Sequence, residues 1–338
     1  MAKKFTAAKA VFAAAGMVVM ILDARTAIEG AQSGVALCIQ TVIPSLFPFL
    51  VLSALLSDTL IGFRSRVFNP ICRMLRIPDG SAPLLLAGIL GGYPVGAQCI
   101  SNAFEQGRLS TAAAKRLLAF CNNCGPAFIF GMVGGIFREK WTPWALWFIH
   151  LISALVVSVL IPAKKEPPII TVRKNDMTIK QAMHRSLRAM ANICGWVILF
   201  RVMIRFLQVW FLWYLPVELQ AAICGILEMT NGCVELCRVG DPSVQFILCA
   251  ALLGFGGVCV TMQTYSVLHP NIDRRMYFPG KVIQSALSAI LAGVIQILIN
   301  GPDNWMIILP IPAVLATIYG ISLRKKQNKC SICDTVGV

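Results

Sequence analysis

Residues 88–96 read Gly-Ile-Leu-Gly-Gly-Tyr-Pro-Val-Gly, and residues 227–232 read Leu-Glu-Met-Thr-Asn-Gly. Each stretch interrupts an apolar segment, because glycine and proline break helices and a carboxylate is costly at membrane depth. Non-helical backbone is tolerated there only where protein or a water-filled cavity satisfies its polar groups. The two stretches therefore predict two broken segments whose tips lie inside a membrane-embedded bundle, near a pathway.

The composition around these stretches is that of a membrane protein. The 338 residues are 57% hydrophobic and 13% charged, whereas soluble chains carry about 25% charged residues. We predict a single all-α, polytopic transmembrane domain over residues 1–338, with a first helix that is retained rather than cleaved. Seven charge-free runs reach the ~20 residues that cross a bilayer: 30–57, 80–104, 117–137, 141–163, 242–272, 282–302 and 304–323.

The basic residues predict the topology. The chain carries 30 Lys and Arg against 15 Asp and Glu, an excess that reflects cytoplasmic loops rather than nucleic-acid binding. If every apolar segment crossed, the basic stretches 105–116 and 164–188 would lie outside. If 83–104 and 218–237 instead enter and return on one side, most basic residues, Lys281 included, face the cytoplasm. We therefore expect about eight crossings, two re-entrant helical hairpins and both termini in the cytoplasm.

The two halves of the chain predict an inverted repeat. The tips end in Gly96 and Gly232, and the helices that follow carry Phe-Cys-Asn-Asn-Cys at 120–124 and Phe-Gly-Gly-Val-Cys at 255–259. In transporters, such repeats with discontinuous helices place the substrate site near the midplane. The expected division is repeat 1 over 34–161 (hairpin 83–104), repeat 2 over 189–300 (hairpin 218–237) and a cytoplasmic tail over 324–338.

Four motifs, in chain order and within about residues 8–325, resemble one known family. They are Pro44-Ser-Leu-Phe-Pro-Phe49, Gly92-Tyr-Pro-Val-Gly-Ala97, Phe120-Cys-Asn-Asn-Cys-Gly-Pro126 and Glu228-Met-Thr-Asn-Gly232. They look like the YlbJ (SpoVV) family of sporulation integral membrane proteins. This family belongs to the nucleoside-recognition Gate group, whose core is similar to the concentrative nucleoside transporters. The resemblance implies dipicolinate transport across the mother-cell-derived outer forespore membrane.

The candidate substrate site combines the two tips with the two interrupted helices. Tyr93 offers an aromatic face for a planar ring, and Asn122 and Asn123 offer amide donors and acceptors. Two alternatives stay open: a simple kink in a spanning helix, and helix–helix hydrogen bonding by the amides. The full candidate set is Gly92, Tyr93, Pro94, Gly96, Asn122, Asn123, Gly125, Glu228, Thr230, Asn231, Gly232, Gly256, Gly257, Gln263 and Arg201.

Ionisable residues inside the apolar segments suggest how transport is driven. A carboxylate at Glu228 costs several kcal/mol unless it is protonated or paired, so it can carry a coupling proton or help to hold Na⁺. The alternative is a fixed ion pair, for instance with Arg201. Arg201 can also bind a substrate carboxylate, and Arg205 is expected to extend outward. His150 and His269 are expected to end their helices near the interfaces.

These observations predict a secondary transporter of a small planar anion, with dipicolinate first, and not an enzyme. The sequence contains no phosphate-binding loop motif and no zinc or Ser–His constellation. Cys121/Cys124 and Cys330/Cys333 have metal-pair spacing but no second pair, so we expect no cofactor. Alternatives are a transporter of nucleosides or other small metabolites and a non-transporting sporulation scaffold. The expected partners are the substrate and membrane lipid, no nucleic acid, and a second copy of the chain as an open option.

Overall fold

The computed structural model describes residues 2–60, 68–162, 169 and 177–300, which contain helices and no strand. The helices of the first half are α1 (Ala2–Leu22), α2 (Ala24–Leu37), α3 (Ile43–Leu60), α4 (Phe68–Met74), α5 (Ala82–Gly91), α6 (Val95–Glu105), α7 (Thr111–Leu118), α8 (Pro126–Gly131) and α9 (Thr142–Leu160). Those of the second half are α10 (Ile179–Trp210), α11 (Val217–Leu227), α12 (Met229–Leu236), α13 (Pro242–Phe255), α14 (Gly257–Val267) and α15 (Tyr277–Asn300).

Five helical stretches of the described residues are long and apolar enough to cross a membrane. A π-helical turn, Cys38–Val42, joins α2 to α3, so the first of these stretches runs through three elements. The prediction of an all-helical membrane protein is confirmed, whereas eight crossings and an inverted repeat stay predictions. The five stretches are Ala24–Leu55, Thr142–Leu160, Ile179–Trp210, Pro242–Val267 and Tyr277–Asn300.

The two expected hairpins are present as helix pairs. α5 packs against α6, and α11 packs against α12, each joined by a very short connection. Their outer bounds, 82–105 and 217–236, agree with the predicted 83–104 and 218–237. The sequence predicts that the first helix of repeat 1 begins at residue 34. In the structure α2 begins at Ala24, because the Asp23 carboxylate accepts a hydrogen bond from Thr26 N at 3.2 Å and caps the helix.

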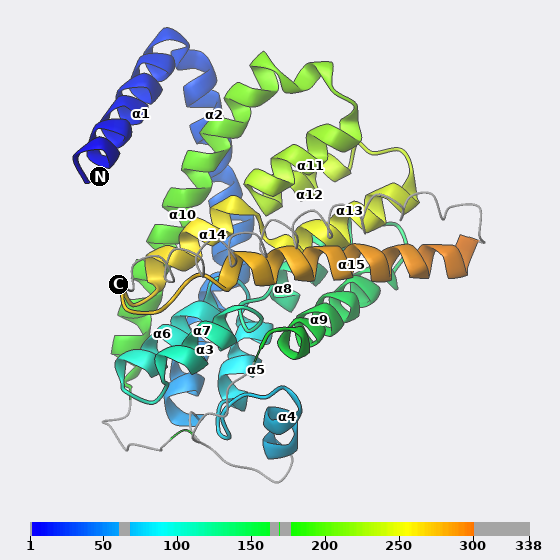
Figure 1. The fold of residues 1–338 in the computed structure, drawn as a ribbon. Helices are drawn as coiled ribbons and strands as arrows, with labels where there is room; N and C mark the ends of the chain where they lie inside the picture. Colours follow the sequence, from blue (N-terminus) through cyan, green and yellow to red (C-terminus); the bar gives the residue numbers. More distant parts are fainter. Residues whose placement is uncertain (1, 61–67, 163–168, 170–176, 301–338) are drawn as a thin grey trace, which may run out of the picture.

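α10, the longest helix of the described residues, runs alongside α2, as Figure 1 shows. Gly30 and Gly34 of α2 face it: an added Cβ at Gly30 would lie 2.8 Å from the Val202 Cα, and at Gly34 3.0 Å from the Ile198 Cα. Small residues four apart let two membrane helices approach closely.

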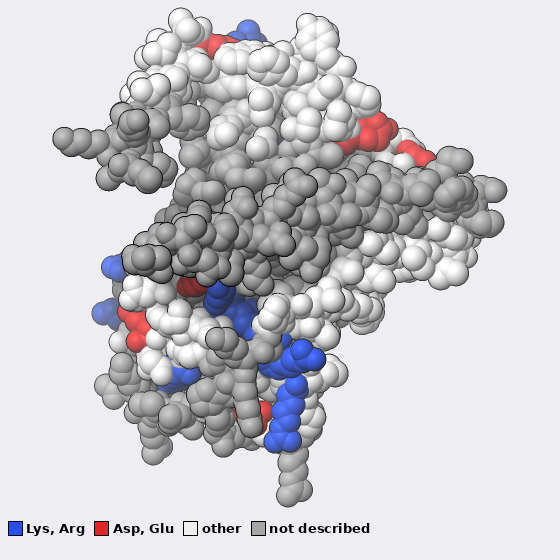
Figure 2. All heavy atoms as spheres, in the orientation of Figure 1, with Lys and Arg blue, Asp and Glu red and all other residues white. Residues whose placement is uncertain are grey.

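The remaining long helices form the other side of the bundle. α15 packs mainly on α13 and α9 and crosses the middle of the view in Figure 1. On the face in Figure 2, Lys and Arg gather below α15, around α4, while the part above is mostly uncharged. The topology predicted from the basic residues stays a prediction. The predicted apolar run 304–323 and the predicted cytoplasmic tail 324–338 lie outside the described residues.

Arg116, in α7, connects α7 to the C-terminal ends of α4 and α9. Its guanidinium is buried and donates to backbone oxygens at and just beyond the C-terminal ends of α4 and α9, where a cation also complements the helix dipole. Its acceptors are the backbone oxygens of Leu75, Arg76, Ser158, Ile161 and Pro162.

We expect Arg116→Met to lower the apparent Tm of the purified protein by about 5 °C or more. The substitution leaves buried carbonyl oxygens without donors, which costs about 1–3 kcal/mol for each such group. Lys115→Met is the matched control: Lys115 pairs with Asp273 at 2.5 Å in a partly exposed ion pair, and such pairs contribute about 1 kcal/mol or less. Equal Tm values for the two variants, measured by thermal unfolding in detergent, would contradict this role of Arg116.

Candidate functional site

The first hairpin tip is held against the interrupted helix that follows it. An added Cβ at Gly88 would lie 1.6 Å from the Cys121 carbonyl oxygen, and one at Gly96 would lie 2.1 Å from the same oxygen. At the tip, Gly92 has φ of 79°, and its added Cβ would be 3.1 Å from Gly125 N. Only glycine fits these three positions, which explains the glycine-rich motif.

The second tip is a helix start capped by a carboxylate. Glu228 separates α11 from α12 and accepts hydrogen bonds from Thr230 N at 3.1 Å and Asn231 N at 2.8 Å. The Asn231 side chain adds a third donor at 2.7 Å. An anion at the first turn of a helix is favourable. Gly232 lets the two arms cross, since its added Cβ would lie 2.2 Å from the Gly225 Cα.

Both helices predicted to be interrupted are broken. Between α7 and α8 the stretch 119–125 leaves the helix and passes the first tip. Between α13 and α14 the break falls at Gly256 and Gly257, with φ of 79° and 88°. An added Cβ at Gly256 would meet the Tyr93 ring at 3.1 Å, and one at Gly257 would meet Gly225 O at 3.1 Å. Each break therefore contacts a hairpin.

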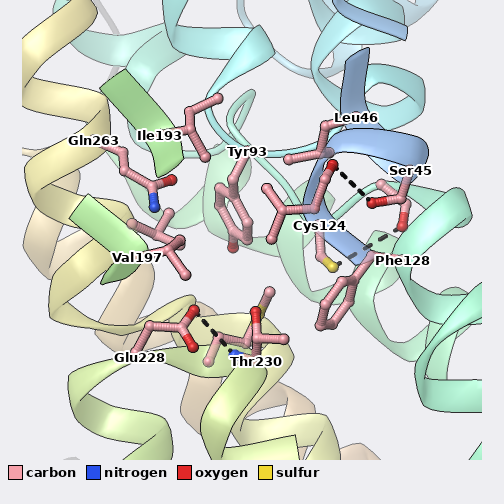
Figure 3. Close-up of a pocket in the computed structure, with 14 residues that line it drawn as sticks. Ser45, Leu46, Tyr93, Cys124, Phe128, Ile193, Val197, Glu228, Thr230 and Gln263 are labelled. Atoms are coloured by element: carbon pink, nitrogen blue, oxygen red, sulfur yellow. Dashed lines mark hydrogen bonds between the residues drawn. The ribbon is translucent and has the colours of Figure 1, made fainter. Parts of the chain in front are cut away.

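One pocket lies where these parts meet. The space inside it that water-sized molecules can enter is about 40 Å³, smaller than the ~300–1,000 Å³ of typical small-molecule sites. Figure 3 shows the Tyr93 ring in the middle, Gln263, Val197 and Ile193 on one side, Ser45, Cys124 and Phe128 on the other, and Glu228 and Thr230 below. The remaining lining residues are Val42, Leu46, Gly125, Met229 and Val260.

Five of the predicted site residues line this pocket together: Tyr93, Gly125, Glu228, Thr230 and Gln263. Gly92 and Gly256 contact lining residues, and Gly96, Gly232 and Gly257 shape the helix crossings. Pro94 precedes α6 at the first tip. A role of these residues in substrate binding stays a prediction.

The two amides of the first interrupted helix lie beside the pocket and are engaged by protein. Asn122 donates to Thr264 Oγ1 at 2.9 Å, and its Oδ1 accepts from Ala97 N at 3.3 Å. Asn123 donates to Phe120 O at 2.7 Å. These contacts favour the alternative in which the amides hold helices together.

Arg201 reaches Glu228 through another residue. Its Nη1 donates to Asn231 Oδ1, whose amide nitrogen donates to Glu228, and its Nε donates to Ser33 Oγ at 2.9 Å. The described residues contain no direct Glu228–Arg201 ion pair. Arg205 forms an ion pair with Glu29 of α2 at 2.8 Å. Arg201 is thus next to the second tip and outside the pocket lining.

A buried polar cluster beside the pocket was missed. Lys281 was assigned to the cytoplasmic face, but the structure buries it completely. His150 was expected at a helix end, whereas it lies inside α9, where its Nε2 accepts from Cys124 N at 3.0 Å. The available signal was the spacing of Lys281, Gln284 and Ser288, which places three polar residues on one face of an apolar helix.

The cysteines give no indication of a metal centre in the described part of the chain. Cys121 and Cys124 are buried free thiols, and no group of three or more His, Cys, Asp or Glu side chains gathers there. Cys330 and Cys333 lie outside the described residues. His269 follows the C-terminal end of α14, as expected. Its backbone N–H donates to Ser101 Oγ at 2.8 Å.

The fold and the pocket define a multi-pass helical membrane protein with two hairpins and two broken helices around a common pocket. The sequence is similar to that of the sporulation integral membrane protein YlbJ of Bacillus subtilis (strain 168): 25% identical over 318 residues, with 80% of this chain and 78% of the relative covered. This similarity supports the resemblance to the YlbJ family that the sequence motifs indicated. No family model matches the chain, and no solved structure matches it at a significant level.

Proposed function

We propose that this protein is a secondary transporter of a small planar anion, with dipicolinate as the first substrate to test. One arrangement supports the proposal: Tyr93 from the first hairpin tip and Glu228 and Thr230 from the second line one pocket. Transporters with paired broken segments bind substrate where those segments meet and open the site to one side at a time.

The pocket chemistry suits a small heteroaromatic molecule. The Tyr93 and Phe128 rings offer surfaces on which a planar ring can stack. Ser45, Thr230 and Gln263 add neutral hydrogen-bonding groups. A few polar groups among apolar walls are typical of sites that orient a small ligand.

The charge of the pocket supports coupling to a cation. Among the described lining residues, Glu228 is an acid and none is Lys or Arg. An anion bound beside a carboxylate is repelled unless a proton or a cation enters with it. Uptake coupled to H⁺ or Na⁺ through Glu228 removes this repulsion. The Asn231 side chain links Arg201 to Glu228.

The cellular setting is part of the proposal. The relative carries the description of a sporulation integral membrane protein. On the basis of this similarity we propose a sporulation role for this chain, in the mother-cell-derived outer forespore membrane. Both termini are then cytoplasmic, as the basic residues predict.

A nucleoside or another neutral metabolite is the second candidate. The specific observation in its favour is the pocket lining, which offers Tyr93, Thr230 and Gln263 to a heterocycle and no basic side chain to an anion. If the protein is instead a non-transporting scaffold, the liposome experiment below is expected to show no uptake of either compound.

We expect liposomes containing the full chain to take up labelled dipicolinate at least about tenfold faster than empty liposomes. A proton or sodium gradient is expected to increase the rate further. Unlabelled dipicolinate should compete, and uridine should not. Uptake of uridine in place of dipicolinate would support the second candidate, and no uptake of either by folded protein would contradict a transport function.

A further inference from the structure

Lys281 is an unusual residue for its position. It lies in the first turns of α15, and 0% of its surface is exposed. None of the salt bridges between described residues includes it. A buried ammonium without a carboxylate is costly, and the N-terminal end of a helix repels a cation. Interactions other than an ion pair must therefore stabilise the Lys281 ammonium.

Oxygen atoms from three segments surround the ammonium. Nζ donates to Gln284 Oε1 at 2.7 Å and to the backbone oxygen of Asn122. Asn123 Oδ1 lies 3.5 Å away and Tyr93 Oη 3.4 Å away. The Tyr93 ring also presents its face, with the ring centre 5.0 Å from Nζ.

The four oxygens are the kind of ligands that a small cation takes. They are neutral carbonyl, amide and hydroxyl oxygens, and the Asn122 carbonyl comes from the stretch that has left its helix. Hard cations prefer oxygen ligands, and unwound carbonyls hold Na⁺ in transporters with broken helices. Gln284 is itself oriented, because its Nε2 donates to Asn123 Oδ1 at 3.0 Å.

We propose that these oxygens form a monovalent-cation site that the Lys281 ammonium fills from within the chain. The ammonium joins the first hairpin tip, the unwound stretch 119–125 and α15 without a free ion. A truncated side chain opens the same site to a small free cation such as NH₄⁺, K⁺ or Na⁺. The inference does not rest on the proposed function, since Lys281 lies outside the pocket lining.

The test compares apparent Tm values of the purified full chain in chloride salts of choline, Na⁺, K⁺ and NH₄⁺ at one ionic strength, about 0.1 M. The wild type is expected to unfold within about 1 °C of the same temperature in all four salts. Lys281→Ala is expected to unfold about 5 °C or more below the wild type in choline, and to regain about 3 °C in at least one small cation.

Two control variants separate a cation site from general salt effects. Lys281→Met fills the space without a charge, so its Tm is expected to be low and equal in all salts. Lys115→Ala removes a lysine from a partly exposed ion pair and is expected to show no preference among the cations.

Several outcomes would overturn the proposal. The first is a Lys281→Ala protein whose Tm is the same in choline and in every small cation, and the second is a Lys281→Met protein as stable as the wild type. If Lys281→Ala does not fold, the wild-type series decides: stabilisation by more than about 2 °C in one small cation means that the oxygens still bind a free ion.

Discussion

Glu228→Gln is expected to reduce gradient-driven uptake of the substrate at least about tenfold, or to leave uptake that no longer responds to a proton or sodium gradient. Glu228 is the acidic lining residue of the pocket, and its carboxylate is held by three donors from Thr230 and Asn231. A neutral amide can neither release a proton nor attract Na⁺. The measurement is the initial uptake rate in liposomes with and without each imposed gradient.

Glu235→Gln is the matched control on the same hairpin. Glu235 accepts from Gln208 at 2.7 Å and pairs with Arg238 at 2.8 Å, and it lies outside the pocket lining. We expect this variant to keep coupled transport. The glutamine at 228 cannot accept from every donor that faces it, which costs about 1 kcal/mol, so the Tm of each variant is recorded alongside. Unchanged, gradient-dependent uptake by a folded Glu228→Gln protein would remove the coupling role.

Gly88→Ala is expected to cost the protein about 3 kcal/mol or more of stability, enough to remove most folded protein from a detergent extract. The added methyl group would lie 1.6 Å from the Cys121 carbonyl oxygen and 3.3 Å from the Gly96 Cα. Both neighbours are backbone atoms, so no side chain can rotate away. The measurement is the yield of monodisperse protein and its apparent Tm.

Gly195→Ala provides the comparison in a helix that has room. Gly195 lies in α10, and nothing is within 4 Å of its added Cβ. Because alanine favours a helix by about 1 kcal/mol over glycine, this variant should be as stable as the wild type or slightly more stable. If Gly88→Ala behaves like Gly195→Ala, the close contact with Cys121 is not present in the folded protein.

The broken segments could be predicted from the sequence because their cause is local. Glycine, proline and an acidic residue in mid-segment interrupt a helix whatever surrounds them. The bounds of α5–α6 and α11–α12 follow from this, as does the break at Gly256 and Gly257. Tyr93 and Glu228 could be placed close together because they occupy the predicted tips, and both line the pocket.

Other residues could not be placed because their position depends on partners distant in the chain. Lys281 follows a basic loop, and its neutral oxygen partners come from Tyr93, Asn122 and Asn123. Charge counting therefore assigned it to the loop. His150 was misplaced for the same reason, because only the fold brings the Cys124 N–H to its ring.

The Cys121 carbonyl that lies between Gly88 and Gly96 has a mechanical consequence. The arms of the first hairpin cannot move closer to the stretch 119–125 at this level, because an added Cβ at Gly88 or Gly96 would already lie 1.6 or 2.1 Å from the Cys121 oxygen. A movement of the hairpin toward this stretch therefore displaces both segments together.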